Sequence, residues 1–364
     1  MTTTVDVPRA LRVSHRVIAS HQAATGAYPA CEEFSAYRGY CWFRDGAFIA
    51  DAMSRIGDKA SATRFHDWAD AVLRAHAQQV DHLMTTATPD VSDMMPTRFT
   101  LDGEPGADPW WDFQLDGYGT WLWAVHQHAT RHGLDVARWG VGITVAARYL
   151  TRFWDMPCYD WWEEHVDQRH GSTLGAIHAG LTAAGGSAAV DAGLRGAAAR
   201  AAKDVRAKLL SDGLTPGGYL SKWVGQDGVD GSLAACVVPF GVVAPGSAVA
   251  EATLAKIEAD LCVGGGVHRF VGDVFFGGGQ WPLLTCLLGW NQAAAGRRDR
   301  AIELLTWAIA QADRDGKVPE QVDANLLHPQ SRAEWVSKWG PVAKPLLWSH
   351  AMIITLATEL GFTP

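Results

Sequence analysis

The segment from Asp160 to Glu164 combines acidic and aromatic residues in a way that could carry out proton chemistry. Its sequence is Asp-Trp-Trp-Glu-Glu, so two adjacent carboxyl groups follow two tryptophans. A poorly hydrated aromatic wall disfavours the charged carboxylate, which raises the pKa of the acid toward values useful for proton donation. Aromatic faces beside carboxylates also suit a sugar, whose C–H faces stack on rings while its hydroxyls need acceptors. An ordinary core followed by a solvated helix start explains the same five residues equally well.

Other charged residues occur in aromatic or glycine-rich segments along the chain. They are Arg44 with Asp45, Asp116, Arg269 with Asp273, and Glu320. Each has a simpler explanation: a helix-start pair, a helix cap, a surface ion pair and an ordinary loop acid, in that order. Only their joint occurrence in one ring of loops favours a binding pocket.

The composition argues against several classes of partner. The 364 residues carry a formal charge of −8 and no run of Lys and Arg, which argues against nucleic acid. No stretch approaches the roughly 18 uninterrupted apolar residues of a membrane span, and Met1–Ala10 lacks the pattern of a secretion signal. The 6 cysteines show no Cys-x-x-Cys spacing, and the 14 histidines show no metal-ligand spacing near these loops. We therefore expect a cytoplasmic monomer with reduced thiols, no metal or cofactor, and no nucleic-acid or membrane partner.

Helical periodicity recurs along the chain, without the strand–helix alternation that would predict a parallel sheet. The expected helices are Val5–Ala24, Gly46–Arg55, Ala60–Thr85, Leu115–His132, Val136–Phe153, Thr173–Ala184, Ala188–Leu210, Ala248–Leu261, Trp281–Ala295, Arg300–Asp313 and Leu346–Leu360. With about twelve helices, alternately short and long connections predict an all-α (α/α)6 toroid, a single domain over residues 1–364. If the helices run up and down, the long aromatic loops share one face, and these loops contain Trp42, Trp110, Trp162, Phe275 and Glu320.

Six segments, taken in order, resemble the motifs of glycoside hydrolase family 15, the family of glucoamylases, glucodextranases and trehalases. They are Tyr37–Gly46, Phe113–Gly119, Asp160–Glu164, His268–Leu283, Val318–Gln321 and Trp348–Ala351. No single motif is specific to this family, but the occurrence of all six in this order over nearly the whole chain is specific. The resemblance implies an (α/α)6 toroid whose pocket removes glucose from non-reducing ends with inversion at the anomeric carbon.

The resemblance also assigns the two acids of the reaction. Glu163 would be the general acid and Glu320 the general base, with the carboxyl groups roughly 6.5–9.5 Å apart as in inverting glycosidases. The tryptophans before Glu163 favour its protonated form, whereas Glu320 is expected to stay ionised at the working pH. The residues alone do not distinguish Glu163 from Glu164, and the resemblance places Glu164 on the leaving-group side.

A further set of residues is assigned by the same resemblance to the binding of the terminal glucose. Arg44 and Asp45 would hold its hydroxyl groups, and Arg269 would add donors. Trp110 or Trp162 would supply stacking. The remaining residues expected at the sugar are Trp42, Asp273, Phe275 and Trp281.

A tyrosine is expected to position the attacking water or to act as an auxiliary base. Tyr37 resembles the family tyrosine, but Gly39 is an apparent insertion between it and Trp42, so Tyr40 is the alternative. Phe275 stands where many members have a tyrosine that would hydrogen-bond this one. We expect that change to free the Tyr37 hydroxyl and to alter the pH dependence of turnover.

The chain shows neither the β-rich domain that precedes the toroid in larger bacterial members nor a starch-binding module. This favours isomaltose and short isomaltooligosaccharides, cleaved at α-1,6 bonds, as substrates. Hydrolysis of α-1,4 bonds and of trehalose are the alternatives, because linkage preference rests on contacts worth only ~1–3 kcal/mol. A non-catalytic, sugar-sensing toroid is a different class of function, and the presence of both Glu163 and Glu320 argues against it.

Overall fold

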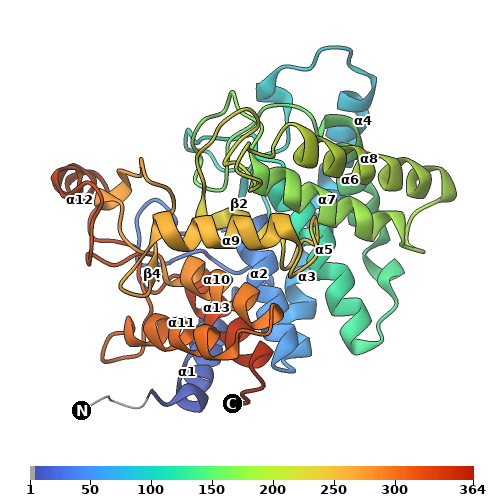
Figure 1. Cartoon of the computed structure of the whole chain (residues 1–364). Helices are drawn as coiled ribbons and strands as arrows, with labels where there is room; N and C mark the ends of the chain where they lie inside the picture. Colours follow the sequence, from blue (N-terminus) through green and yellow to red (C-terminus); the bar gives the residue numbers. More distant parts are fainter. Residues whose placement is uncertain (1–4) are drawn as a thin grey trace.

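Thirteen α-helices make up about half of the chain in the computed structural model, which describes residues 5–364 (Figure 1). They are α1 (Val7–His21), α2 (Phe43–Arg55), α3 (Lys59–Ala75), α4 (Ala77–Thr85), α5 (Asp116–His132), α6 (Gly140–Phe153), α7 (Gly171–Gly185), α8 (Ala192–Ser211), α9 (Ala248–Leu261), α10 (Pro282–Ala294), α11 (Arg298–Ala310), α12 (Arg332–Trp339) and α13 (Leu347–Glu359). The described 3-10 helices are η1 (Val91–Asp93), η2 (Val136–Trp139), η3 (Gly231–Cys236), η4 (Phe275–Gly277) and η5 (Pro329–Ser331). The described strands are β1 (Tyr40–Trp42), β2 (Arg98–Thr100), β3 (Cys262–Val263) and β4 (Gly266–Val267).

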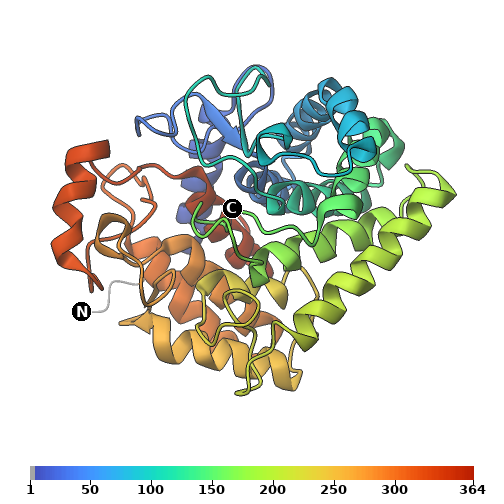
Figure 2. The same ribbon diagram turned by 90° about the horizontal axis from the view of Figure 1, so that it is seen from above.

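The helices form two concentric rings, which Figure 2 shows from above. The inner ring closes in the order α2, α5, α7, η3, α10 and α13, since each element packs against the next and α13 packs against α2. The outer ring consists of α1, α3, α6, α8, α9 and α11, and each of these packs against an inner neighbour. This arrangement confirms the predicted (α/α)6 toroid.

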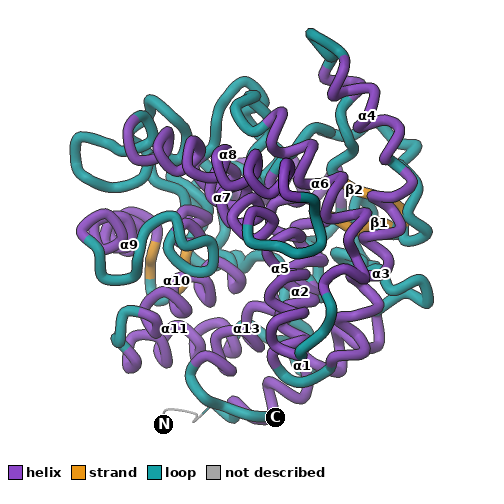
Figure 3. The backbone as a smooth tube through the Cα atoms, turned by 90° about the vertical axis from the view of Figure 1, so that its right-hand side faces the viewer, coloured by secondary structure: helices purple, strands orange, loops and turns teal. Residues whose placement is uncertain are grey.

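The two ends of the toroid differ in the length of their loops. α1 and the C-terminus lie toward the lower end in Figure 1, and long loops extend toward the upper end, as the loops coloured teal in Figure 3 show. Long loops at one end of a ring of helices can bring distant parts of the sequence together.

One position of the inner ring is not an α-helix. η3 fills the place between α7 and α10 as a 3-10 helix of 6 residues. Pro239 follows shortly after it, and because proline has no N–H, a helical hydrogen-bond ladder cannot continue through it. The Asn291 side chain of α10 instead bonds the N–H and the carbonyl of Val238, at 3.1 and 3.2 Å.

Two helical segments differ from the sequence prediction. The expected helix Ala60–Thr85 is broken at His76 into α3 and α4, and the His76 ring hydrogen-bonds with the Val72 carbonyl at 2.9 Å. This bond closes the last turn of α3. The prediction lacks α12, because none of its 8 residues is buried and it shows no pattern of core-facing positions.

A short two-stranded ribbon, absent from the all-α prediction, precedes α2. β1 pairs antiparallel with β2, and Trp42 lies opposite Arg98. Because β2 belongs to the long connection between α4 and α5, the ribbon fixes that connection against the start of α2. The backbone of Trp42 is therefore fixed on two sides, by the ribbon and by the helix that follows it.

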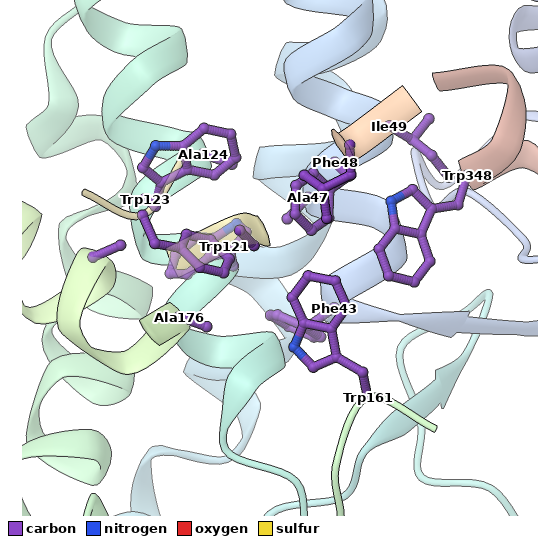
Figure 4. Packing of buried hydrophobic residues seen from close by; sticks show 14 of the residues in the cluster. Phe43, Ala47, Phe48, Ile49, Trp121, Trp123, Ala124, Trp161, Ala176 and Trp348 are labelled. Carbon is purple, nitrogen blue, oxygen red and sulfur yellow. The ribbon is translucent and has the colours of Figure 1, made fainter. Parts of the chain in front are cut away.

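Large aromatic side chains from several inner elements pack together in the core (Figure 4). Phe48 of α2 stacks on Trp348 of α13, with ring centroids 5.3 Å apart and planes 21° apart. Trp161, from the loop after α6, lies 5.9 Å from the first ring and 5.5 Å from the second. Trp161 and Trp348 also line the cavity described below, so close packing of the core fixes part of the cavity wall.

The cysteines and the helix lengths can be compared with two expectations from the sequence, reduced thiols and the absence of a membrane span. All six cysteines are free thiols, and burial raises the pKa of the Cys158 thiol to about 12, which keeps it neutral at neutral pH. Within residues 5–364 the helices are too short or too polar to pass through a bilayer. The first four residues of the N-terminal segment that lacks a signal pattern lie outside the described residues.

Candidate active site

A cavity of about 320 Å³ lies between loops that the sequence predicted to share one face. Its volume is at the lower end of the range for small-molecule sites, roughly 300–1,000 Å³. Most of its wall is aromatic, and charged groups interrupt it at a few places. The sequence-predicted residues that line it are Tyr37, Trp42, Arg44, Asp45, Trp110, Trp162, Glu163, Glu164, Arg269, Phe275, Trp281 and Glu320.

The Asp160–Glu164 loop is a tight turn organised by its first residue. The Asp160 carboxylate accepts hydrogen bonds from the backbone N–H groups of Trp162 and Glu164, both at 2.9 Å. Glu163 has a φ of 63°, in the left-handed region that residues other than glycine rarely adopt. Such a conformation costs of order 1–3 kcal/mol and persists only where its surroundings fix it.

Lys222 fixes this loop from the connection between α8 and η3. Its ammonium group donates to Asp160 Oδ2 at 3.0 Å and to Asp230 Oδ2 at 2.6 Å. Asp230 also accepts a hydrogen bond from the indole N–H of Trp162 at 2.9 Å. Burial lowers the pKa of Lys222, but the two carboxylates raise it above its ordinary value, so the ammonium stays charged. All three charged side chains are buried, and each therefore depends on the others for its stability.

Glu163 lies in poorly hydrated surroundings at the end of this loop. Its Oε1 accepts a hydrogen bond from Trp42 Nε1 at 2.6 Å. Burial raises the pKa of Glu163 to about 7, while the Arg44 charge and the Trp42 hydrogen bond limit the rise. The carboxyl group is thus protonated over a wide acidic and near-neutral range, as a proton donor must be.

Glu320 is buried on the loop between α11 and η5. The Tyr37 hydroxyl donates to Glu320 Oε1 at 2.9 Å. Burial raises the pKa of Glu320 to about 8, and the Tyr37 hydrogen bond and the Arg269 charge oppose that rise. The sequence-based expectation of an ionised Glu320 did not take its burial into account, and burial favours the protonated form.

The structure separates the two candidate tyrosines. Burial and the Glu320 charge raise the pKa of Tyr37 well above its ordinary value, so its hydroxyl is a neutral donor to that carboxylate. The Tyr40 hydroxyl donates instead to Asp108 at 2.9 Å. Tyr37 is therefore the tyrosine beside the candidate base. Its hydroxyl is engaged, contrary to the expectation that Phe275 would leave it free.

Tyr37 and Trp42 join the two carboxyl groups into one aromatic frame. Their rings meet edge to face, with centroids 5.3 Å apart. Because Trp42 donates to Glu163 and Tyr37 donates to Glu320, these two rigid rings fix how the carboxyl groups face the cavity. A fixed frame suits an inverting arrangement, in which substrate and water must fit between the two groups.

Arg44 and Asp45 lie in the first turn of α2 and connect it to the start of α5. Arg44 Nη1 donates to Gln114 Oε1 at 2.7 Å and to Asp116 Oδ2 at 3.0 Å. Asp116 is thus a buried anchor for Arg44, and the explanation of it as a helix cap is wrong, since Leu115 holds the N-cap position. Burial raises the pKa of Asp45 to about 6, although the Arg44 charge opposes this.

Arg269 is held from behind by a carboxylate. It makes two hydrogen bonds to Asp273, one of them from Nε to Oδ2 at 2.8 Å. It also donates to Glu164 Oε1 at 3.1 Å. Asp273 is fully buried and lies outside the cavity wall. It therefore orients Arg269, and the expectation that Asp273 itself contacts the sugar is wrong. The explanation of the pair as a surface ion pair is also wrong.

Several buried polar atoms of the cavity wall have no hydrogen-bond partner among residues 5–364. They are Arg44 Nε, Glu320 Oε2 and the indole nitrogens of Trp161, Trp281 and Trp348. Buried polar groups are normally hydrogen-bonded, so water or a polar ligand in the cavity would satisfy these atoms. The same described residues contain no group of three or more His, Cys, Asp or Glu side chains placed to hold a metal ion.

The cavity wall includes tryptophans to which the sequence reasoning gave no role. They are Trp111, Trp161, Trp335, Trp339 and Trp348. Trp348 opens one of the six motifs, so a signal for it was present, whereas Trp335 and Trp339 belong to the unpredicted α12. Lys222 and Asp230 had no local signal, because only the fold brings them to the acid loop.

Comparisons with known proteins agree with this geometry. The sequence profile described as Glycosyl hydrolases family 15 matches residues 9–274. The chain is 58% identical over 358 residues to the isomaltose glucohydrolase of Kribbella flavida, and the match covers 97% of this chain and 93% of that protein.

Solved structures extend the similarity to three dimensions. A wild-type glycosidase shares 57% identity and a TM-score of 0.96, with 98% of each chain covered, and a variant in complex with glucose is equally similar. A bacterial glucoamylase complexed with acarbose shares 20% identity and a TM-score of 0.76 over 97% of this chain and 56% of that one, a likeness of fold alone. The profile match and the 58% identity over nearly the whole length show that this chain belongs to glycoside hydrolase family 15.

Proposed function

We propose that the protein is an inverting, exo-acting α-glucosidase that releases glucose from the non-reducing end of isomaltose. The observation that carries the proposal is the placement of Glu163 and Glu320, which reach one small aromatic cavity from two separate loops. The Kribbella flavida relative is named for isomaltose and matches nearly the whole chain, which supports the choice of substrate.

In the proposed mechanism Glu163 gives its proton to the glycosidic oxygen as the bond from that oxygen to the anomeric carbon breaks. Ionised Glu320 takes a proton from a water molecule that attacks the anomeric carbon from the opposite face. The products are β-glucose and the released sugar, with Glu163 ionised and Glu320 protonated. Proton exchange with solvent restores the starting state. Tyr37 orients Glu320 and the attacking water.

The charged residues of the wall would hold the terminal glucose. Arg44 and Asp45 offer a donor and an acceptor for its hydroxyl groups, and Arg269 adds donors to the same sugar. Glu164, which accepts from Arg269, would bind on the leaving-group side. A neutral polyol suits such pairs, since each hydroxyl both donates and accepts. The aromatic residues proposed to stack on or enclose the sugar are Trp42, Trp110, Trp162, Phe275 and Trp281.

Cleavage of α-1,4 bonds and of trehalose are the alternative activities, because small contacts on the leaving-group side decide linkage. We propose further that residues 1–364 act as one catalytic domain. The monomeric state and the cytoplasmic location stay predictions from the sequence.

The substrate is tested by incubating the purified protein with isomaltose, maltose, trehalose, dextran and soluble starch. We expect glucose to be released fastest from isomaltose. Glu163→Gln and Glu320→Gln should each lower kcat by about 10²–10⁴-fold, because each removes a proton-transfer group. Their circular dichroism should match the wild type, and Glu303→Gln, at an exposed site on α11, should leave kcat unchanged. Release of glucose from none of the sugars would favour a binding-only function, and faster release from maltose or trehalose would replace the proposed substrate.

Replacement of Tyr37 by phenylalanine tests how the base is kept ionised. Activity rises with pH as Glu320 loses its proton, and the Tyr37 hydrogen bond lowers the pKa of Glu320. Tyr37→Phe should therefore move the acidic limb of the pH dependence of kcat/KM to higher pH. The loss in kcat/KM should be about 10–100-fold, the equivalent of one hydrogen bond to a charged group at about 1.5–3 kcal/mol. Tyr40→Phe is the matched control and should keep the wild-type profile. An acidic limb that stays in place in Tyr37→Phe would contradict this role.

Replacement of Lys222 by methionine tests whether the buried cation positions the acid loop. Lys222→Met should lower kcat by about 100-fold, the effect of a displacement near 1 Å at the reacting group, with a much smaller change in KM. The exposed Lys203→Met on α8 should behave as the wild type. Because loss of one partner of a buried ion pair costs about 3–5 kcal/mol, thermal unfolding is measured alongside. Asp230→Asn keeps the pair of Lys222 with Asp160 and provides the milder variant. A folded Lys222→Met protein with wild-type kcat would refute the positioning role.

A further inference from the structure

α12 stands apart from both rings of the toroid. None of its residues is buried, and it packs chiefly against η4 and η5, two other short helices outside the rings. Figure 1 and Figure 2 both show it at the outer edge of the molecule. Its main aromatic contact is that of Trp335 with Phe275, whose ring centroids lie 4.9 Å apart in an edge-to-face geometry. A helix with so little core contact has a small part in the stability of the barrel.

The side chains of α12 instead border the cavity. Trp335 and Trp339 both belong to its wall, together with Trp111 from the connection before α5. Trp111 is 40% exposed, which places it at the entrance of the cavity and not in its depth. Large aromatic groups left partly exposed at an entrance favour contact with a ligand over packing.

A single cation connects the two sides of this entrance. Lys338 Nζ lies 4.9 Å from the ring centroid of Trp339 and 5.4 Å from that of Trp335, both on α12. It lies 6.0 Å from the ring centroid of Trp111 on the opposite side, within the range of a cation–π contact. We name Trp111, Trp335, Lys338 and Trp339 the entrance collar.

Both ends of α12 are attached to elements that carry the candidate base and its tyrosine. At its first residue, Arg332 pairs with Asp323, in the loop that holds Glu320. At its last residue, the Trp339 carbonyl accepts from Ser35 Oγ at 3.3 Å, shortly before Tyr37 in the chain. The collar is thus positioned by the same segments as the candidate base, on the side of the cavity open to solvent.

We infer that the entrance collar limits the leaving group to about one sugar unit and so confines the enzyme to short α-glucosides. This inference rests on the proposed function. Trp111 and the two tryptophans of α12 line the cavity, so a longer leaving chain would have to pass between them. The rings of the collar stack on the single leaving sugar, and Lys338 keeps the passage narrow. Trp111, Trp335 and Trp339 are therefore specificity-determining residues for chain length.

The test compares kcat/KM for isomaltose with kcat/KM for isomaltotetraose. The wild-type protein should prefer isomaltose by at least about tenfold, and Trp335→Ala should reduce that preference by about tenfold through a gain on the tetrasaccharide. Lys338→Ala, an exposed change that leaves the rings in place, should shift the ratio in the same direction by a smaller factor. Glu334→Ala, exposed on the same helix and outside the cavity wall, is the control and should keep the wild-type ratio.

Three results would overturn the inference while leaving the proposed function intact. They are equal wild-type activity on both sugars, a wild-type ratio in both variants, and a ratio that changes only through a loss on isomaltose. Thermal unfolding of Trp335→Ala is measured in parallel, and Lys338→Ala decides the matter if Trp335→Ala does not fold. Absence of glucose release from isomaltose by the wild-type protein would refute the proposed function itself, and this inference with it.

Discussion

The burial of two carboxyl groups in one aromatic cavity is the constraint on which the rest of the site depends. Low hydration raises the pKa of Glu163 to about 7 and that of Glu320 to about 8, so both groups resist ionisation. A raised pKa keeps a proton donor protonated, whereas a general base has to be ionised to accept a proton. The site counters the effect at Glu320 with the Tyr37 hydroxyl and the Arg269 charge. These two influences still leave the pKa of Glu320 above that of Glu163, so the proposed division of labour rests on where each group lies relative to the glycosidic oxygen and the attacking water.

Those neighbours are charged and buried as well, and Arg44 and Lys222 each have a partner from a different part of the chain. Arg44 at the start of α2 is held by Asp116 of α5, and Arg269 is held by Asp273. Lys222 pairs with Asp160 in the acid loop and with Asp230 before η3. A buried charge without a partner is strongly destabilising, so these pairs lock the loops of the inner ring to one another. The strained backbone of Glu163 persists because the loop around it is locked in this way.

The sequence allowed a good part of this to be predicted, for physical reasons that differ between residues. Glu163 and Glu320 could be proposed as acid and base because each lies in a short segment that resembles a family motif, and the toroid followed from the count and spacing of helices. The pairing of Lys222 with Asp160 could not, since residues 62 positions apart give no local signal for a contact. α12 could not be predicted, because a helix without buried residues shows no periodic pattern of hydrophobic residues in the sequence. Asp273 had the right chemistry for a sugar ligand, and only the fold shows that Arg269 occupies both of its oxygens.

The central claim is that Glu163 and Glu320 act from opposite faces of one sugar, and the configuration of the released glucose tests it most directly. Proton NMR during the first minutes of isomaltose hydrolysis distinguishes the two anomers before they interconvert. The account predicts that β-glucose appears first and that the α anomer follows only by mutarotation. Initial release of α-glucose would contradict it, because retention requires a carboxylate to attack the sugar and leaves no place for a water activated by Glu320.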